Sequence, residues 1–354
     1  MNKNKLKEFI FSLCSVMSVS GFEKRAEKPI TELTAGMFDS TLTDAVGNRI
    51  FIKKCGKQNA PRVLIDAHLD EIGMIVTEVC KGGFLRIANL GGIDVSIMQA
   101  ADVIVYGEKP LRGVIASTPP HLKKDDKLPA FSELLVDTGL SEDTLKELVD
   151  VGTPVGFAPI YGELLNGRLI GKSFDDKACA ACALLAIAET PGEELAADVY
   201  VMLSATEETN RLGGVAAGAF RCDPDYAMVI DVNLARVPDT KDYETVEMDK
   251  GISISLSAAT DRRLSMATAE LCRRKDIPFS LIAAPSSTGT NATTVNLVGL
   301  GIPTVDVGLP LACMHTYNEV ISMTDAMSLA RLVREFVCSK EIAAEMTREE
   351  VSLI

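Results

Sequence analysis

Histidine is scarce in this chain: among 354 residues there are only three, His68, His121 and His315. The chain also lacks any run of about 18 or more consecutive apolar residues, the length that a membrane span needs. Basic residues are outnumbered by acidic ones, 36 against 49, which gives a formal net charge of −13. This balance disfavours binding to nucleic acid or to an anionic membrane surface. The few histidines therefore become the most informative residues.

A disulfide framework is also lacking. The nine cysteines are odd in number and scattered from Cys14 to Cys338, which is typical of reduced, buried thiols and favours a cytoplasmic protein. The N-terminus imitates a secretion signal, with a basic start followed by apolar residues, but Glu8 interrupts the junction and no Ala-x-Ala-like cleavage site follows. Apolar residues recur there at helical spacing, so we expect an amphipathic first helix instead.

Short apolar runs rich in valine and isoleucine, such as Val63-Leu64-Ile65, predict buried strands of an α/β fold. From Gly167 onward strands alternate with predicted helices, whereas the stretch from Gly73 to about Gly162 consists of short β-runs broken by glycine and proline. We therefore predict a catalytic domain formed by residues 1–72 and 165–354, interrupted by an inserted β-rich domain at residues 73–164. Near the start of the chain, Ser20 with Glu23 three residues later predicts the N-terminal cap of a helix.

Several polar residues come directly after predicted buried strands: His68 and Asp70, Glu207 and Glu208, Asp231, and His315. The carboxyl ends of strands in an open α/β sheet carry its chemistry, so we expect these side chains to share one edge. Crowded imidazoles and carboxylates would repel one another or stay poorly solvated unless cations neutralised them. Asp175, at the start of the next predicted helix, could bridge two such cations. The pattern predicts a divalent metal site.

Each member of this set also has a structural interpretation. Asp175 and Asp176 could simply favour a helix N-terminus through the helix dipole, and Glu207 with Glu208 could form a solvated acidic loop. In the metal interpretation, Asp70 accepts the ring proton of His68 and fixes its tautomer. One of the adjacent glutamates ligates a metal, while the other moves a proton. Cys179 and Cys182 fit better as core residues, and His121 lies in the inserted domain.

The order of these residues resembles the co-catalytic metalloaminopeptidase family that includes glutamyl, deblocking and tetrahedral aminopeptidases, some members of which are known as cellulase M. The resemblance runs nearly end to end through the segments Val19-Ser-Gly-Phe-Glu23, Asp66-Ala-His-Leu-Asp-Glu-Ile-Gly73, Gly113 to His121, Phe174-Asp-Asp-Lys177, Glu207-Glu208, Asp231 and Met314-His315. It implies an α/β fold with a mixed central sheet and helices on both faces, as in dinuclear zinc peptidases. It also implies that the insertion is a small PDZ-like or β-barrel domain.

The resemblance also assigns roles. It implies two divalent metal ions per subunit, with zinc favoured over cobalt or manganese. The ligands would be His68 and Asp231 for one ion and Glu208 and His315 for the other, with Asp175 as the bridge. Glu207 would be the general base, and the peptide between Asp175 and Asp176 would be cis. The inserted domain would join subunits into a dimer or dodecamer.

The departures from the family pattern lie beside these positions. Ala312-Cys313 stand where the family commonly has Arg-Tyr, Asn291 stands where it has Asp, and Lys177 replaces a common Arg. These changes leave the hydrolytic residues in place but alter the groups that would hold a substrate. We therefore expect a retained reaction whose substrate preference the sequence does not fix.

The predicted function is a cytoplasmic, metal-dependent hydrolase that removes N-terminal residues from short peptides. Metal-bound hydroxide would attack, and Glu207 would act as general base. One alternative is an endoglucanase-type hydrolase, as the cellulase M name implies, although glycosidases use paired carboxylates without a metal pair. A second alternative is a metal-binding scaffold that has lost catalysis through the pocket substitutions.

Overall fold

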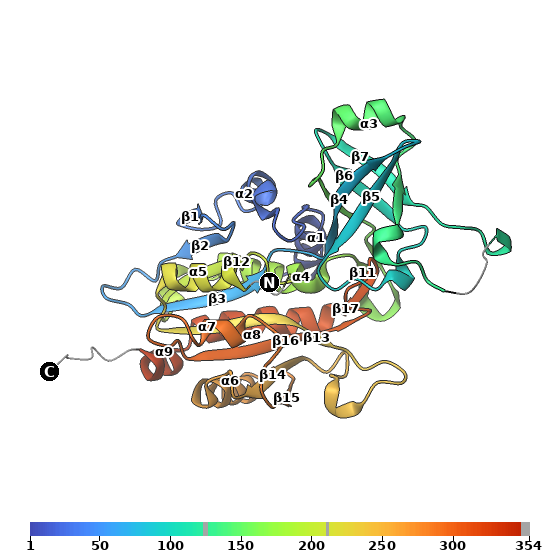
Figure 1. Cartoon of the computed structure of the whole chain (residues 1–354). Coiled ribbons are helices and arrows are strands. Elements are labelled where there is room, and N and C mark those ends of the chain that lie inside the picture. Colours follow the sequence, from blue (N-terminus) through green and yellow to red (C-terminus); the bar gives the residue numbers. More distant parts are fainter. Residues whose placement is uncertain (123–126, 210–211, 348–354) are drawn as a thin grey trace.

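The computed structural model describes residues 1–122, 127–209 and 212–347 of the chain. It consists of a large mixed β-sheet covered by helices and a closed β-barrel that projects from one end of the sheet (Figure 1). The predicted α/β fold with an inserted β-rich domain is thus confirmed. The C-terminal residues 348–354 of the predicted catalytic domain lie outside the described residues.

The large sheet contains eleven strands within the described residues. Its centre is parallel. β3 lies between β12 and β13 and runs parallel to both, and β13 runs parallel to β16. Antiparallel strands extend it on either side. The strands are β1 (Ser40–Thr43), β2 (Arg49–Lys53), β12 (Asp198–Ser204), β3 (Arg62–His68), β13 (Tyr226–Leu234), β16 (Thr304–Ala312), β17 (Glu319–Ser322), β11 (Arg168–Gly171) and β10 (Gly162–Glu163), with β14 (Ile252–Ser257) between β16 and β15 (Phe279–Ala284).

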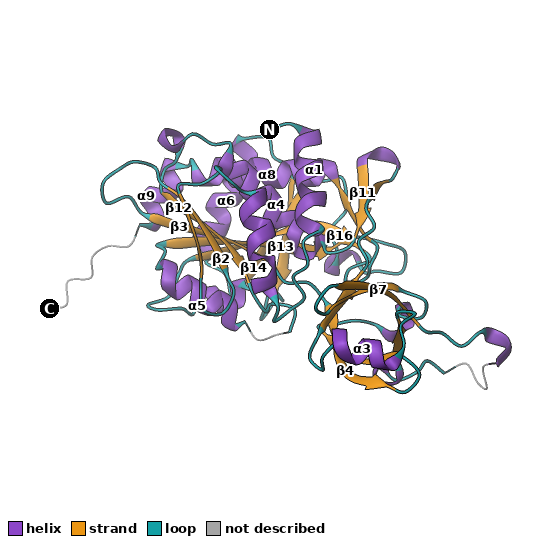
Figure 2. Ribbon diagram, turned by 90° about the horizontal axis from the view of Figure 1, so that it is seen from above, coloured by secondary structure: helices purple, strands orange, loops and turns teal. Residues whose placement is uncertain are grey.

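Helices cover both faces of this sheet, and each face has its own hydrophobic core. On β3, Val63 and Ile65 pack into the larger core and Leu64 into the smaller one, the alternation that a strand requires. The larger core includes α1 (Lys3–Cys14), α2 (Glu27–Leu33), α4 (Phe174–Ala188), α6 (Arg262–Arg274), α8 (Met323–Val337) and α9 (Lys340–Met346). The smaller core includes α5 (Gly213–Cys222) and α7 (Ala292–Val295). Figure 2 shows α1, α4 and α6 on one side of the strands and α5 on the other.

The inserted domain is a closed barrel with strand order β4-β5-β8-β7-β6-β9 and a separate core. Its elements are β4 (Gly73–Cys80), β5 (Phe84–Leu90), β6 (Asp102–Tyr106), β7 (Pro110–Ile115), β8 (Leu135–Asp137), α3 (Glu142–Leu148) and β9 (Pro154–Phe157). The barrel begins directly after the segment that carries His68 and Asp70. β10 lies within the predicted 73–164 range but pairs with β11 of the large sheet. The domain boundaries 1–72, 73–164 and 165–354 therefore stay a prediction.

Two predictions about local structure have different outcomes. Cys179 and Cys182 are fully buried in α4, as expected of core residues. The predicted helix cap at Ser20 is wrong: residues Glu23–Ala26 form a 3-10 helix without a side-chain cap, and the Ser20 hydroxyl lies 3.1 Å from Thr209 Oγ1. Within the described ranges, no helix combines the length and the apolar character that a membrane span requires.

A buried ionic cluster joins the segment after α1, the segment after β3 and the start of α4. The Glu71 carboxylate accepts hydrogen bonds from Lys172 and Ser173, and its Oε2 lies 3.2 Å from Lys177 Nζ. Lys177 Nζ also donates to the carbonyl oxygen of Val16 at 2.7 Å. Burial alone would raise the pKa of Glu71, but the charges of Lys172 and Lys177 outweigh it and lower that pKa to about 2.

We expect Glu71→Gln to lower the free energy of unfolding by about 3–5 kcal/mol at pH 7, because two buried ammonium groups lose their carboxylate. The pKa of Glu71 is about 2 in the folded protein, below its usual 4.5. Its stabilising contribution is therefore complete above about pH 4.5 and declines as the pH falls towards 2. Urea unfolding followed by circular dichroism should show the gap between variant and wild type narrowing over this range.

Glu78→Gln is the matched control for this experiment. Glu78 pairs with Arg86 on the exposed surface of the barrel, so its loss should cost under about 1 kcal/mol. A loss of stability as small for Glu71→Gln as for the control would contradict the importance of the buried cluster.

Candidate metal centre

The predicted site residues meet at the edge of the sheet where the parallel strands end. His68 closes β3, Asp231 lies within β13, and Glu207, Glu208 and His315 follow β12 and β16. All of these except His68, together with Asp175 of α4, line one cavity of about 360 Å³. The structure therefore brings together residues that are up to 247 positions apart in the chain. His121, by contrast, is exposed in the inserted domain.

Asp175 occupies the centre of this group. Its Oδ1 lies 3.0 Å from His68 Nε2, and its Oδ2 lies 3.4 Å from His315 Nε2. One carboxylate thus presents one oxygen to each imidazole. Asp231 Oδ1 is 3.9 Å from the same His68 nitrogen, and Glu208 Oε2 is 3.3 Å from the same His315 nitrogen. Each imidazole therefore has two carboxylates near it, and Asp175 is near both imidazoles.

The chemistry of these donors fits divalent cations. His68, Asp175 and Glu208 offer donor atoms that all lie within 4.8 Å of one another, as do His68, Asp176 and Asp231. Burial raises the pKa of Asp231 and of Glu208 well above the usual range, and the charges of neighbouring acids add to the rise. Carboxylates held this way are costly to ionise unless a cation compensates them. Imidazole and carboxylate together suit zinc and several other divalent metals.

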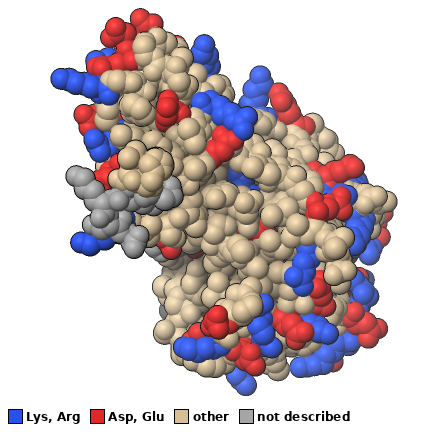
Figure 3. All heavy atoms as spheres, turned by 90° about the vertical axis from the view of Figure 1, so that its right-hand side faces the viewer, with Lys and Arg blue, Asp and Glu red and all other residues tan. Residues whose placement is uncertain are grey.

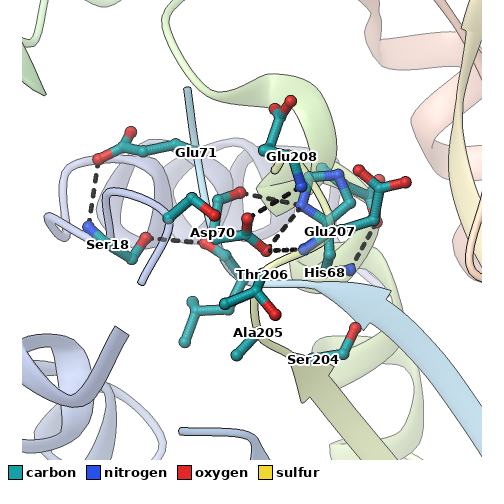
Figure 4. Close-up of polar contacts among 12 residues, drawn as sticks. Ser18, His68, Asp70, Glu71, Ser204, Ala205, Thr206, Glu207 and Glu208 are labelled. Atoms are coloured by element: carbon teal, nitrogen blue, oxygen red, sulfur yellow. Dashed lines mark hydrogen bonds and ion pairs between the residues drawn. The ribbon is translucent and has the colours of Figure 1, made fainter. Parts of the chain in front are cut away.

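Asp70 positions several of these groups, although its contact with His68 differs from the prediction. His68 Nδ1 lies 2.9 Å from the backbone carbonyl oxygen of Asp70 and 3.6 Å from its carboxylate. The carboxylate instead accepts hydrogen bonds from the backbone N–H groups of Glu207 and Glu208, each at 3.0 Å (Figure 4). Asp70 thus orients the imidazole through its main chain and the two glutamates through its side chain.

Two buried glutamates that the sequence analysis did not assign to the site also hold it in place. Glu319 accepts hydrogen bonds from the backbone N–H groups of Asp175 and His315, both at 3.1 Å. Glu23, interpreted from sequence as part of a helix cap, accepts from the N–H of Thr206 at 3.0 Å. The available signal was a single acidic residue in the apolar run Glu319-Val320-Ile321, but no sequence pattern identified its hydrogen-bond partners.

The inserted domain also contributes to the site. The segment after β5 places the carbonyl oxygen of Gly92 3.0 Å from His315 Nδ1, which leaves Nε2 directed at Asp175 and Glu208. A Cβ at Gly92 would lie 2.9 Å from the same ring nitrogen. Only glycine therefore fits there without displacing His315.

The backbone around the site adopts uncommon conformations. Ser173, Thr206, Cys313 and His315 all have positive φ angles near 60°, which non-glycine residues rarely adopt. The peptide bond between Asp175 and Asp176 is cis, as the resemblance implied. Such conformations concentrate at functional sites, where the surrounding structure holds them.

The departures at Asn291, Ala312 and Cys313 lie in different places. Asn291 is buried, and its Nδ2 donates to Asp66 Oδ2 at 3.0 Å and to Ser204 Oγ at 2.9 Å, so it does not line the cavity. Cys313 is exposed, and Ala312 ends β16. Of these three positions, only Cys313 is exposed, and Ala312 next to it is half-buried.

The chain is similar to known proteins over most of its length. The M42 glutamyl aminopeptidase family matches residues 47–332. A lysyl aminopeptidase from Pyrococcus furiosus is 28% identical over 324 residues, which cover 89% of this chain and 92% of that protein. The chain also resembles an aminopeptidase structure from the archaeon Desulfurococcus kamchatkensis, with a TM-score of 0.89, 26% identity and 99% of each chain covered.

Two further solved structures are similar over nearly the whole chain. The TET1 peptidase of Pyrococcus horikoshii, described as assembling into a tetrahedron or a large octahedral shell, has a TM-score of 0.83 and 26% identity, with 94% of this chain and 99% of that chain covered. A Thermotoga maritima protein described as an endoglucanase has a TM-score of 0.78 and 25% identity, with 96% and 99% covered. Because the family match extends over most of the sequence, this chain belongs to the M42 glutamyl aminopeptidase family and is a metallopeptidase.

Proposed function

We propose that this protein is a dinuclear metal-dependent aminopeptidase that removes N-terminal residues from short peptides. One ion would be held by His68 and Asp231, and the other by Glu208 and His315, with Asp175 between them. The observation that carries this proposal is the placement of the two Asp175 oxygens, one beside each histidine. Bound divalent ions would polarise the scissile carbonyl and lower the pKa of the attacking water.

Glu207 is the residue that we assign to proton transfer. It lines the cavity beside Asp175 and Glu208, and its backbone N–H is fixed by Asp70. Burial raises the pKa of Glu207; His68 lowers it, whereas Asp175 and Asp70 add to the rise. A carboxylate with a raised pKa can take the proton of the attacking water and return it to the nitrogen of the leaving amine. Asp70 acts as a positioning residue in this scheme.

The cavity supports cleavage at a free N-terminus. Its volume of about 360 Å³ accommodates one or two residues rather than a folded protein surface. The acidic groups that line it attract the α-ammonium group of a peptide, and this amine would lie beside the ligating carboxylates. Short peptides with an unblocked N-terminus are therefore the proposed substrates.

Three further features of the chain support proposals about its assembly, its cellular location and its partners. We infer a homo-oligomer joined through the inserted barrel, supported by the likeness to the assembling TET1 peptidase and by the way the barrel projects from the sheet. The nine free cysteines support a location in the cytoplasm, where thiols stay reduced. On the face in Figure 3, basic and acidic side chains are interspersed rather than gathered into a basic field, which is consistent with no nucleic-acid partner.

The endoglucanase alternative has two similar structures in its favour, one described as an endoglucanase and one as a putative peptidase or endoglucanase, but little support from the site. Glycosidases act through two carboxylates on either side of a sugar, whereas these carboxylates are grouped with two histidines. Cleavage of a soluble β-glucan that survives chelation of metals would favour the glucanase. A chelator-sensitive release of N-terminal residues from peptides would favour the aminopeptidase.

We expect Glu207→Gln to bind metal like the wild type but to lose activity by roughly a factor of 10² to 10⁴, because the amide cannot accept the proton of the attacking water. Hydrolysis of a panel of aminoacyl p-nitroanilides measures the loss, and elemental analysis measures the metal. Glu78→Gln on the barrel surface is the control and should leave both unchanged. Full activity in Glu207→Gln would remove Glu207 from the mechanism.

We expect the protein to bind two equivalents of Zn²⁺, Co²⁺ or Mn²⁺ per chain after dialysis against a chelator, with activity returning as the second equivalent is added. Asp175→Asn should reduce tight binding to one equivalent or fewer, because an amide cannot bridge two cations as a carboxylate does. Calorimetric titration and elemental analysis give the stoichiometry. A single equivalent in the wild type with full activity would rule out the dinuclear proposal.

A further inference from the structure

The inserted barrel lies against one half of the candidate metal centre. Its Gly91-Gly92 segment, which follows β5, contacts Glu208 and His315. A Cβ placed on Gly91 would lie 3.3 Å from the backbone carbonyl oxygen of Glu208, and one placed on Gly92 would lie 2.9 Å from Nδ1 of His315. Besides the bridging Asp175, these two residues are the proposed ligands of one ion, here called the second ion. The barrel therefore touches both of its own ligands.

The proposed ligands of the first ion, His68 and Asp231, belong to the large sheet instead. His68 pairs with Ser204 of β12, and Asp231 pairs with Gly308 of β16. The side chain of His68 is 2% exposed, whereas that of His315 is 36% exposed. Packing in the sheet restrains His68, but the more exposed ring of His315 needs contacts from another element to keep its orientation.

Tyr317 supplies a further contact between the loop that carries His315 and the barrel. It lies two residues after His315, and its ring packs against Phe157 of β9 with the ring centroids 5.5 Å apart. Phe157 is buried in the hydrophobic core of the barrel. Aromatic pairs in such an offset or tilted arrangement attract each other beyond the effect of the area that they bury. The loop is therefore joined to the barrel at two points.

The Gly91-Gly92 segment is in turn held by the rest of the barrel. Nδ2 of Asn89, in β5, donates to the carbonyl oxygen of Gly91 at 2.9 Å. Ile93, the next residue after the segment, packs against the core of the barrel. The carbonyl group that accepts from the His315 ring is thus fixed relative to the barrel rather than to the large sheet.

We propose that Tyr317 is a positioning residue that, together with the Gly92 carbonyl group, holds the His315 imidazole in place for the second ion. The barrel then sets the affinity for this ion and not for the ion at His68. This inference rests on the proposed dinuclear function. It follows from the two contacts that the His315 loop makes with the barrel and from the placement of His68 within the sheet.

The first test is a titration of metal-depleted Tyr317→Ala with Co²⁺, followed by calorimetry and by the visible absorption of the bound ion. We expect one equivalent to bind roughly tenfold to a hundredfold more weakly, the range for residues that orient a ligating histidine, and the other to keep its wild-type affinity. With one equivalent bound, the spectrum should match that of His315→Ala, in which only the first ion keeps its ligands.

Two variants accompany this test. Tyr317→Phe keeps the aromatic ring that packs on Phe157 and should bind both equivalents like the wild type. Tyr243→Ala is the matched control, because it makes the same truncation at an exposed tyrosine that does not line the cavity.

Gly92→Ala tests the other contact without removing a side chain from the barrel core. Its methyl group would displace the His315 ring and should weaken the same equivalent. Gly213→Ala is the control: a Cβ at Gly213 meets no atom within 4 Å. Both glycines are exposed, and neither has a positive φ angle, so alanine fits either backbone.

The outcomes separate this inference from the proposed function. Wild-type affinity for both equivalents in folded Tyr317→Ala or in Gly92→Ala, or an equal weakening of both equivalents, would overturn the role of the barrel and leave the aminopeptidase proposal intact. If circular dichroism shows that Tyr317→Ala does not fold, Gly92→Ala decides. A wild-type protein that binds fewer than two equivalents would overturn the dinuclear centre, and this inference with it.

Discussion

The structure depends on one electrostatic constraint: several carboxylates and two imidazoles are buried together at one edge of the sheet. Asp175, Glu208 and Asp231 are each less than a tenth exposed, and their separation from the histidines is between 3.0 and 3.9 Å. Such a group is stable only when cations or hydrogen bonds compensate its charge. The buried side chains around this group are themselves acidic, and they accept hydrogen bonds from main-chain N–H groups of the loops that carry it.

That surrounding layer follows a common pattern. Asp70, Glu23 and Glu319 are buried carboxylates, and each accepts hydrogen bonds from backbone N–H groups beside a site residue. They fix loops rather than bind ligands. The barrel extends this support, because Gly92 directs the ring of His315 from outside the large sheet. The large sheet and the barrel therefore both contribute to the candidate site.

Much of the fold and most of the candidate site were predictable from local pattern. Apolar runs gave the parallel strands, and the end of a strand gave the positions of His68 and Glu208. The contacts of the supporting residues were not predictable, because they join segments far apart in the sequence: Glu23 reaches Thr206, and Glu71 reaches Lys177. The local spacing of Ser20 and Glu23 predicts a helix cap, because the pair fits the capping-box pattern. A spacing rule describes neighbours along the chain, whereas these side chains act on neighbours in space.

The family departures can now be separated by what each side chain touches. Asn291 donates one N–H₂ group to both Asp66 and Ser204 beneath the cavity, whereas an aspartate there would place a second carboxyl against Asp66. Burial already raises the pKa of Asp66 to about 7, so the amide removes a charge conflict without altering the cavity lining. Lys177 is likewise buried against Glu71 and Val16. Neither Asn291 nor Lys177 lines the cavity, so neither substitution changes the groups that would face a substrate there.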